Sequence, residues 1–160
     1  MIIIRPATYA DVEDVMDRIS EISADEMVRC GVDSAWKGLG RAKMCKDKGY
    51  LDVGVRDGVP QCVFGGVRDG HVMRTWFIAA KEYFEGGLPV IRASRRHMAR
   101  VAKLYPNFSI EAASLSQHPD VTRWFETMGF EVTQKAGDAT LFRYKSTNST
   151  AGSNSANFLD

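Results

Sequence analysis

Two adjacent glycines before a helical segment form the part of the sequence best suited to bind an anion. Gly86 and Gly87 precede a segment that reads as a helix from about Pro89 to Tyr105. A helix N-terminus carries unpaired N–H groups and partial positive charge, so it suits a phosphate group. The same helix adds positive charge through three arginines: Arg92, Arg95 and Arg96. A phosphate ligand would therefore be expected against this glycine pair.

Two neighbouring residues oppose that interpretation. Glu85 places negative charge where the ligand would be negative, and Pro89 removes one backbone donor. The glycine pair can also be read as a simple turn before a helix, and this second interpretation is favoured. Basic residues recur at helical spacing along the same segment, at Arg92, Arg96, Arg100 and Lys103. Such a stripe is most often a solvated helix face, although it also suits a phosphate, nucleic acid or an acidic protein.

The segment from Gln117 to Glu131 reads as a short helix that ends at a glycine and leads into a strand. Pro119 suits the first helical turn, and Gly129 is a typical residue just past a helix C-terminus. Large apolar residues share one face of this helix or open the strand, namely Trp124, Phe125, Met128 and Phe130. We predict that these four side chains belong to the core.

The remaining elements follow from hydrophobic spacing and turn signals. Turns at Asp57–Gly58 and Arg68–His71 join three strands, the last of which is Val72–Ala80. Before them come a strand, a helix and a second helical region. That region spans about 24–48, and its expected anchors are Trp36 and Leu39. After them come a helix, a strand at Phe108–Ala113, the segment just described and a final hairpin.

This order of elements, with the sequence WFETMGFE, resembles the GNAT acyltransferase superfamily over nearly the whole chain. The resemblance implies an α+β (α/β) fold, in which about four helices flank a mixed, mostly antiparallel sheet. Val72–Ala80 and Phe108–Ala113 would then be neighbouring parallel strands. Residues 1–145 would form this domain, and the Ser- and Asn-rich residues 146–160 would form a tail. A narrower resemblance, through VMRTWFIAAKEYF and HPDVTRWFETMGFE, is to the small GNAT-like proteins of T7-like short-tailed bacteriophages.

The resemblance also implies a cofactor and a base. Acetyl-CoA would lie between the fourth and fifth strands, with its pyrophosphate at Gly86–Gly87. A glutamate near the incoming amine, Glu111 or Glu82, would act as general base. Glu111 can equally be a carboxylate that pairs with an arginine such as Arg74, and the residues do not decide between these two readings.

Two positions depart from the family pattern. Phe125 stands where a tyrosine usually protonates the leaving thiolate, and His118 stands where an asparagine is usual. Phenylalanine has no proton to give, and His118 is better read as a polar residue flanking a helix. Together with the residues that oppose the phosphate site, these departures predict weak or absent acetyl-CoA binding.

The composition fits one soluble domain. A net charge of +1 over 160 residues gives no general nucleic-acid or membrane signature. Three cysteines without metal-ligand spacing indicate a reducing compartment and no metal site. No signal peptide or membrane-spanning run is expected. Together with the phage resemblance, this implies a location in the host cytoplasm or in a virion.

Two functions remain after this reading. The favoured one is a catalytically weakened phage accessory or virion-associated protein that binds a virion or host protein. The alternative is an acetyl-CoA-dependent N-acetyltransferase acting on a small amine or a protein amino group. Either function is compatible with a homo-oligomer.

Overall fold

The computed structural model describes residues 1–145, and the predicted tail at 146–160 lies outside these residues. Within this range, the chain forms one sheet from seven strands: β1 (Ile2–Pro6), β2 (Gly49–Arg56), β3 (Val59–Asp69), β4 (Val72–Ala79), β5 (Ser109–Ser114), β6 (Phe130–Ala136) and β7 (Ala139–Tyr144). The helices of the same range are α1 (Tyr9–Asp17), α2 (Glu21–Arg29), α3 (Ala35–Lys48), α4 (Lys81–Phe84), α5 (Gly87–Leu104) and α6 (Pro119–Met128). The described part of the chain thus has six helices, where the sequence predicted about four.

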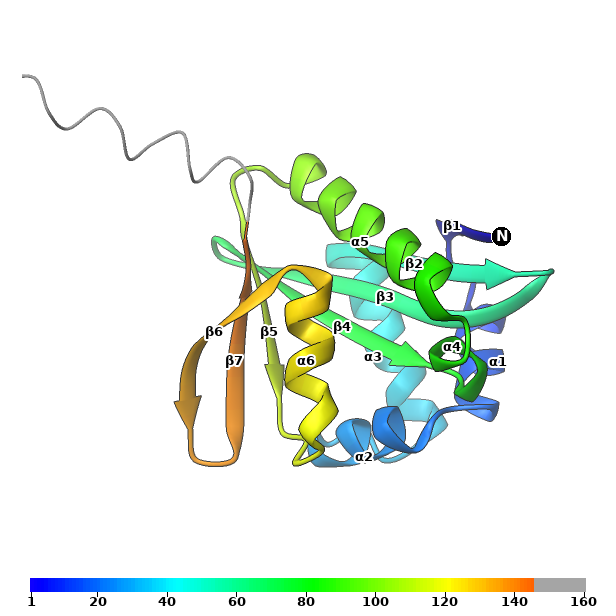
Figure 1. Cartoon of the computed structure of the whole chain (residues 1–160), viewed down its shortest axis with the longest axis horizontal. Coiled ribbons are helices and arrows are strands. Elements are labelled where there is room, and N and C mark those ends of the chain that lie inside the picture. The colour runs from blue at the N-terminus through cyan, green and yellow to red at the C-terminus, as the bar shows by residue number, and fades with distance from the viewer. Residues whose placement is uncertain (146–160) are drawn as a thin grey trace, which may run out of the picture.

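The sheet confirms the predicted topology. Its strand order is β1-β2-β3-β4-β5-β7-β6, and every neighbouring pair is antiparallel except β4 and β5 (Figure 1). Asp57 and Gly58, both at positive φ, form the predicted two-residue turn between β2 and β3. Gly129 ends α6, and the chain enters β6 at Phe130. The strand pair β4–β5, predicted to be parallel, is the only such pair in the described sheet.

The helices before β2 differ from the prediction in two ways. The first helix, capped by Thr8, ends at Asp17, and a second cap at Ser20 starts the separate helix α2. The predicted anchor Trp36 is wrong, because its side chain is 85% exposed on the first turn of α3. Leu39 does pack against the core. The spacing of the two residues was compatible with one helix face, but α3 turns Trp36 toward solvent.

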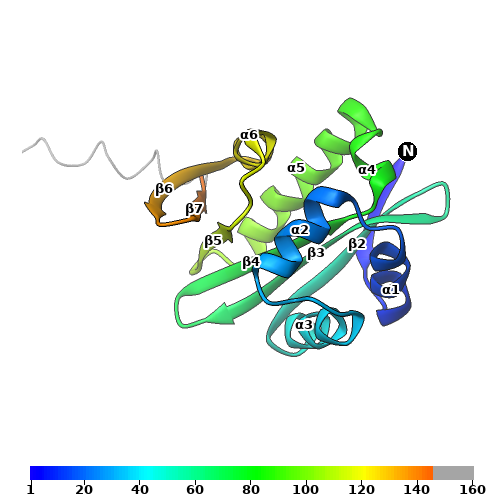
Figure 2. The same ribbon diagram turned by 90° about the horizontal axis from the view of Figure 1, so that it is seen from below.

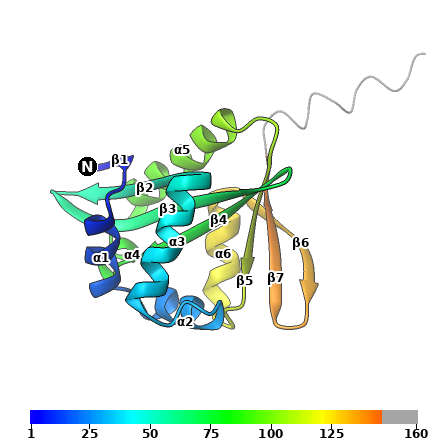
Figure 3. The same ribbon diagram turned by 180° about the vertical axis from the view of Figure 1, so that it is seen from behind.

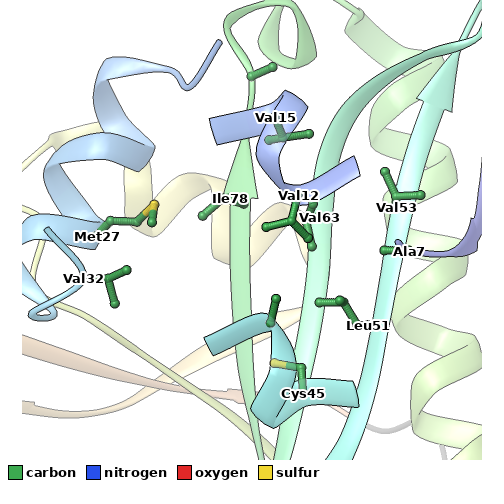
Figure 4. Close-up of a cluster of buried hydrophobic side chains, with 12 residues drawn as sticks. Ala7, Val12, Val15, Met27, Val32, Cys45, Leu51, Val53, Val63 and Ile78 are labelled. Atoms are coloured by element: carbon green, nitrogen blue, oxygen red, sulfur yellow. The ribbon is translucent and has the colours of Figure 1, made fainter. Parts of the chain in front are cut away.

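Helices cover both faces of the sheet (Figures 2 and 3). On one face, α1, α2 and α3 enclose a core that includes Val12, Met27, Cys45, Val63 and Ile78 (Figure 4). The helices of this layer approach closely at a glycine of α3. A side chain at Gly38 would collide with the sulfur of Met16 on α1 and contact Met27 on α2. A larger residue here would therefore force the flexible end of the Met16 side chain to move.

On the other face, α5 and α6 pack over a second core built around Met73, Ile110 and Phe142. Met128 and Phe130 are buried in it, and Trp124 and Phe125 are partly buried against it, as predicted. No helix in residues 1–145 is both long and apolar enough to span a membrane.

Candidate functional site

The parallel strands β4 and β5 separate soon after they begin. They pair at three positions only, the last joining Arg74 to Glu111. Just beyond it, the hydroxyl of Thr75 donates a hydrogen bond to the carbonyl oxygen of Glu111, with 3.1 Å between the oxygens. Past this link, β4 pairs only with β3 and β5 only with β7 among the described residues. The facing edges of the two strands are therefore not paired with each other. At the end of β4, the N–H of Ala79 donates to the hydroxyl of Ser23, and its carbonyl oxygen accepts from the N–H of Ser20.

A cavity of about 940 Å³ lies at this separation and is called here the main cavity. Its walls come from β4 and β5, from α6 on one face and from α2 on the other, so it reaches both sides of the sheet. Figure 1 shows α6 in front of the diverging strands and α2 near their lower ends. The alternation of strand side chains makes the two sides of the cavity chemically different.

The side beneath α5 and α6 is aromatic. Phe77 of β4 stacks on Trp124 of α6, with ring centroids 4.4 Å apart. Phe125 stacks on Phe142 at 4.2 Å. The indole Nε1 of Trp124 is buried and has no hydrogen-bond partner within residues 1–145. Trp124 and Phe125 thus combine the predicted core role with a place in the cavity wall, which Phe77 and Phe142 also line.

The opposite side carries charged groups, among them the predicted base. Both Nε and Nη2 of Arg143 donate to the same oxygen of Glu111, Oε1, at 3.3 and 3.0 Å. The other oxygen, Oε2, has no hydrogen bond within the described residues. Arg74 pairs instead with Asp69, at 2.9 Å from Nε to Oδ2. Glu111 is thus an ion-paired carboxylate that lines the main cavity and keeps one free oxygen.

A second carboxylate, not singled out from the sequence, also lines the main cavity. Glu26 on α2 accepts hydrogen bonds from the hydroxyl of Ser114 and the N–H of Leu115, both at 2.9 Å. The thiol of Cys30 donates to the same carboxylate at 3.4 Å. Because both oxygens are engaged, Glu26 fixes α2 to the end of β5 and so holds the cavity open on that side.

The other predicted base occupies a different place. Glu82 on α4 pairs with Arg18, at 3.0 Å, and does not line the main cavity. Arg18 also bonds to Asp14 and to the carbonyl of Pro60. This network joins α1, α4 and β3, which gives Glu82 a structural role at that junction.

The predicted phosphate site lies at the N-terminus of α5. No side chain caps this helix, whose N-cap residue is Gly86 and whose first residue is Gly87. A methyl group added at Gly86 would collide with Val90 and lie 2.7 Å from Nη1 of Arg56. The guanidinium of Arg56 therefore lies directly beside the helix N-terminus, a position that no sequence motif indicated.

The three arginines predicted to assist there are Arg92, Arg95 and Arg96. All three are exposed on α5 and none lines the main cavity. His118, by contrast, has the helix-flanking role expected of it, since its Nδ1 accepts a hydrogen bond from the N–H of Asp120 at 3.2 Å. Within residues 1–145, no three His, Cys, Asp or Glu side chains converge as metal ligands would.

A buried polar group lies behind α5. His97 has a side chain only 1% exposed, and neither ring nitrogen has a hydrogen-bond partner among the described residues. Its Nε2 lies 3.7 Å from Oδ2 of Asp52. Burial, and to a lesser degree the charge of Arg100, lowers the pKa of His97 to about 4. Burial raises the pKa of Asp52. This region of the aromatic side is therefore dry and disfavours charge.

No protein-family model matches the chain, and no curated protein matches its sequence. Among solved structures it is similar to the PaiA N-acetyltransferase of Thermoplasma acidophilum in complex with coenzyme A. That alignment has 12% identity and a TM-score of 0.68, and it covers 91% of this chain and 99% of that chain. The chain is also similar to the GNAT domain of S. lividans PAT, with 16% identity, 88% of each chain covered and a TM-score of 0.69.

A third similar structure is the ribosomal-protein-S18-alanine N-acetyltransferase of Escherichia coli, with 11% identity, 90% and 93% coverage and a TM-score of 0.65. The fold is that of the GNAT N-acetyltransferases. This finding confirms the predicted fold class, and the likeness is one of fold because all three identities lie between 11% and 16%.

In this GNAT fold, the predicted Glu111 lines the main cavity, and two polar residues that sequence reasoning did not name lie nearby: Glu26 in the same lining and Arg56 beside the start of α5. Arg56 and Glu26 come from β2 and α2, far from the predicted motif in the sequence. Neither has a neighbour pattern that marks it, since each gains its position only when distant elements pack together. A lone glutamate or arginine in an amphipathic segment gives no such signal.

Proposed function

We propose that this chain is an acyl-CoA-dependent N-acyltransferase whose donor and amine acceptor meet between β4 and β5. The observation that carries the proposal is the pair of facing strand edges, which diverge after Arg74 and Glu111 around the main cavity. The pantetheine arm of coenzyme A is extended and contains amide groups. Such an arm can pair with free strand edges in the way that a peptide adds to a sheet.

The N-terminus of α5 supports the phosphate end of the same ligand. The space beside Gly87 is open, since a side chain there would meet no atom within 4 Å, and the uncapped first turn offers N–H donors. Arg56 adds a positive charge beside it. Pro89 removes one donor and Glu85 adds a negative charge, so fewer groups favour a diphosphate here than in a glycine-rich loop without them. The residues present fit coenzyme A, with Arg56 as the compensating charge.

The residues of the main cavity can serve acyl transfer to an amine. When bound, acyl-CoA supplies a thioester carbonyl carbon that accepts the amine nitrogen as the C–S bond breaks. Oε2 of Glu111 is free to take the proton that the amine must lose. Phe125 stacks on Phe142 and cannot donate a proton, so the leaving thiolate takes one from water. Holding the amine beside the thioester supplies much of the rate.

The solved structure that contains coenzyme A adds support of a general kind, since its fold is shared over 91% of this chain. The favoured sequence-based function, a phage protein that acts by binding a partner, stays a prediction. The two functions differ in one measurable property, which is whether coenzyme A binds.

Calorimetric titration of acetyl-CoA into the purified chain tests the proposal. We expect micromolar binding and release of free thiol when an amine is added. Gly86→Ala should weaken binding strongly, because the added methyl collides with Val90 and displaces the guanidinium of Arg56 from the α5 N-terminus. Gly40→Ala is the matched control, since a side chain at Gly40 meets no atom within 4 Å. Absence of binding at millimolar acetyl-CoA would overturn the proposal and favour a GNAT scaffold used for protein contacts.

A further inference from the structure

A second cavity adjoins the main cavity on the α3 side of the sheet. It has a volume of about 310 Å³ and is called here the basic pocket. Both cavities are lined by Arg41, Arg74, Thr75 and Trp76, so the two share this wall. Thr75 is also the residue whose hydroxyl closes the last link between β4 and β5. The basic pocket therefore opens directly beside the point where the strands separate.

Positive charge dominates the basic pocket. Its charged residues comprise four cations and a single carboxylate: Arg41, Lys48, Arg68, Arg74 and Asp69. Asp69 is already paired with Arg74. Arg68 is held in place by a hydrogen bond from its Nε to the carbonyl oxygen of Lys48, at 3.0 Å. Three of the four cations thus have no carboxylate within 4.0 Å among residues 1–145.

Arg41 is the best placed of these cations to meet a ligand. It is partly buried, whereas the other three are exposed. Burial raises the pKa of the Cys30 thiol to about 11, and the charge of Arg41 acts in the opposite direction, so the guanidinium lies near that thiol. A partly buried cation without a partner is costly to keep, and a bound anion would remove that cost.

The predicted base faces the same side of the sheet as this cation. Trp76 packs with the core beneath α1, α2 and α3, and Arg74, two residues earlier on β4, shares its face. Glu111 is the neighbour of Arg74 on β5, while Ile110 and Ala112 belong to the opposite core. Glu111 and Arg41 therefore face the same side of the sheet, and both line the main cavity there.

We infer that the acceptor is a small primary amine that also carries an anionic group, a carboxylate or a phosphate, bound in the basic pocket. The inference rests on the proposed acyl transfer and names its acceptor class. Arg41 binds the anionic group, and the indole of Trp76 contacts the carbon chain between anion and amine. The same cations repel a polyamine, which would place like charge in the pocket.

The test compares matched amines in acetyl transfer from acetyl-CoA, followed by thiol release. The pairs are glycine with glycinamide, and O-phosphoethanolamine with ethanolamine, so each pair differs in its anionic group. We expect kcat/KM to be about 10-fold or more higher for the anionic member of at least one pair, the scale of one charge-assisted contact. The pair that shows the preference identifies carboxylate or phosphate. Spermidine should be the poorest substrate.

Arg41→Gln should remove this preference by raising KM for the anionic amine. Lys43→Gln is the matched control, because Lys43 lies on the exposed face of α3, pairs with Asp47 and lines neither cavity. Equal or better turnover of glycinamide, ethanolamine and spermidine would overturn the inference while leaving acyl transfer intact. A preference that survives Arg41→Gln in a variant of unchanged thermal midpoint would also overturn it. Loss of all thiol release, with no acetyl-CoA binding, would overturn both proposals together.

Discussion

The two sides of the β4–β5 cleft differ in what they bring to it. Beneath α5 and α6 the wall is aromatic, and Phe77, Trp124 and Phe125 belong to stacked pairs there. Beneath α2 and α3 the wall holds the charged side chains of Arg41 and Glu111. Since adjacent strand residues point to opposite faces, the same short strands build both walls. This division suits a reaction in which one side holds the donor and the other selects and deprotonates the acceptor.

The largest effect should follow from removing the carboxylate of the polar side. Glu111→Gln should lower kcat by about 100-fold or more at neutral pH, because the amide cannot take the proton of the amine. Glu131→Gln on β6 is the control. Like Glu111, Glu131 is a strand carboxylate with a basic neighbour, here Lys145, but it lines neither cavity. Steady-state rates with saturating acetyl-CoA measure both. An unchanged kcat in Glu111→Gln would remove the base from the polar side.

The aromatic side should show its role in stability. Trp124→Ala should lower the free energy of unfolding by roughly 3 kcal/mol, because it removes a ring stacked on Phe77 and packed on the second core. Trp36→Ala, at a side chain that is 85% exposed, should change it by less than about 0.5 kcal/mol. Urea unfolding of both variants measures the difference. Similar losses in the two would contradict the placement of these tryptophans.

The burial of His97 behind α5 predicts that the stability of the fold depends on pH. The pKa of His97 is about 4 in the folded chain against 6.5 in an unfolded one, so between these values only the unfolded state takes up the proton. Stability from this group is present above pH 6.5 and is lost as pH falls toward 4, by roughly 3 kcal/mol. His97→Gln should show a shallower fall across this window. The raised pKa of Asp52 acts in the opposite sense, so the difference between variant and wild type is the measured quantity.

The smallest of these effects concerns Arg56 at the N-terminus of α5. Arg56→Ala should weaken acetyl-CoA binding by about 10-fold, the scale of one charge-assisted contact to phosphate. Arg92→Ala and Arg96→Ala serve as comparisons, since both residues are exposed on α5 and outside the main cavity. Calorimetry at low and high salt measures all three. A larger loss in the Arg92 variant than in the Arg56 variant would restore the sequence-based assignment.

Local signals made most of the fold predictable. The turn at Asp57–Gly58 and the helix stop at Gly129 depend on nearby residues alone, and both are confirmed. The parallel pairing of β4 and β5 was implied by the resemblance to the GNAT superfamily. Trp36 was misplaced because helical spacing gives a face but not the direction in which the helix turns that face.

The site was less predictable because its residues come together only in three dimensions. Glu111 was named because the family resemblance implies a glutamate near the incoming amine, and it does line the main cavity. Arg41 and Glu26 reach that cavity only through the packing of α3 and α2. The packing of β2 brings Arg56 beside the N-terminus of α5. The arginines of α5 were chosen for closeness in sequence to Gly86, whereas Arg56 is close in space.

The glycine at position 38 has a consequence for the evolution of this chain. It sets how near α3 lies to α1 and α2, and Arg41 follows one turn later on the same helix. A larger residue at that position must displace the end of the Met16 side chain or shift α3, and a shift of α3 would carry Arg41 with it. The acceptor preference proposed above would then change through a substitution that touches no ligand and leaves β4 and β5 as they are.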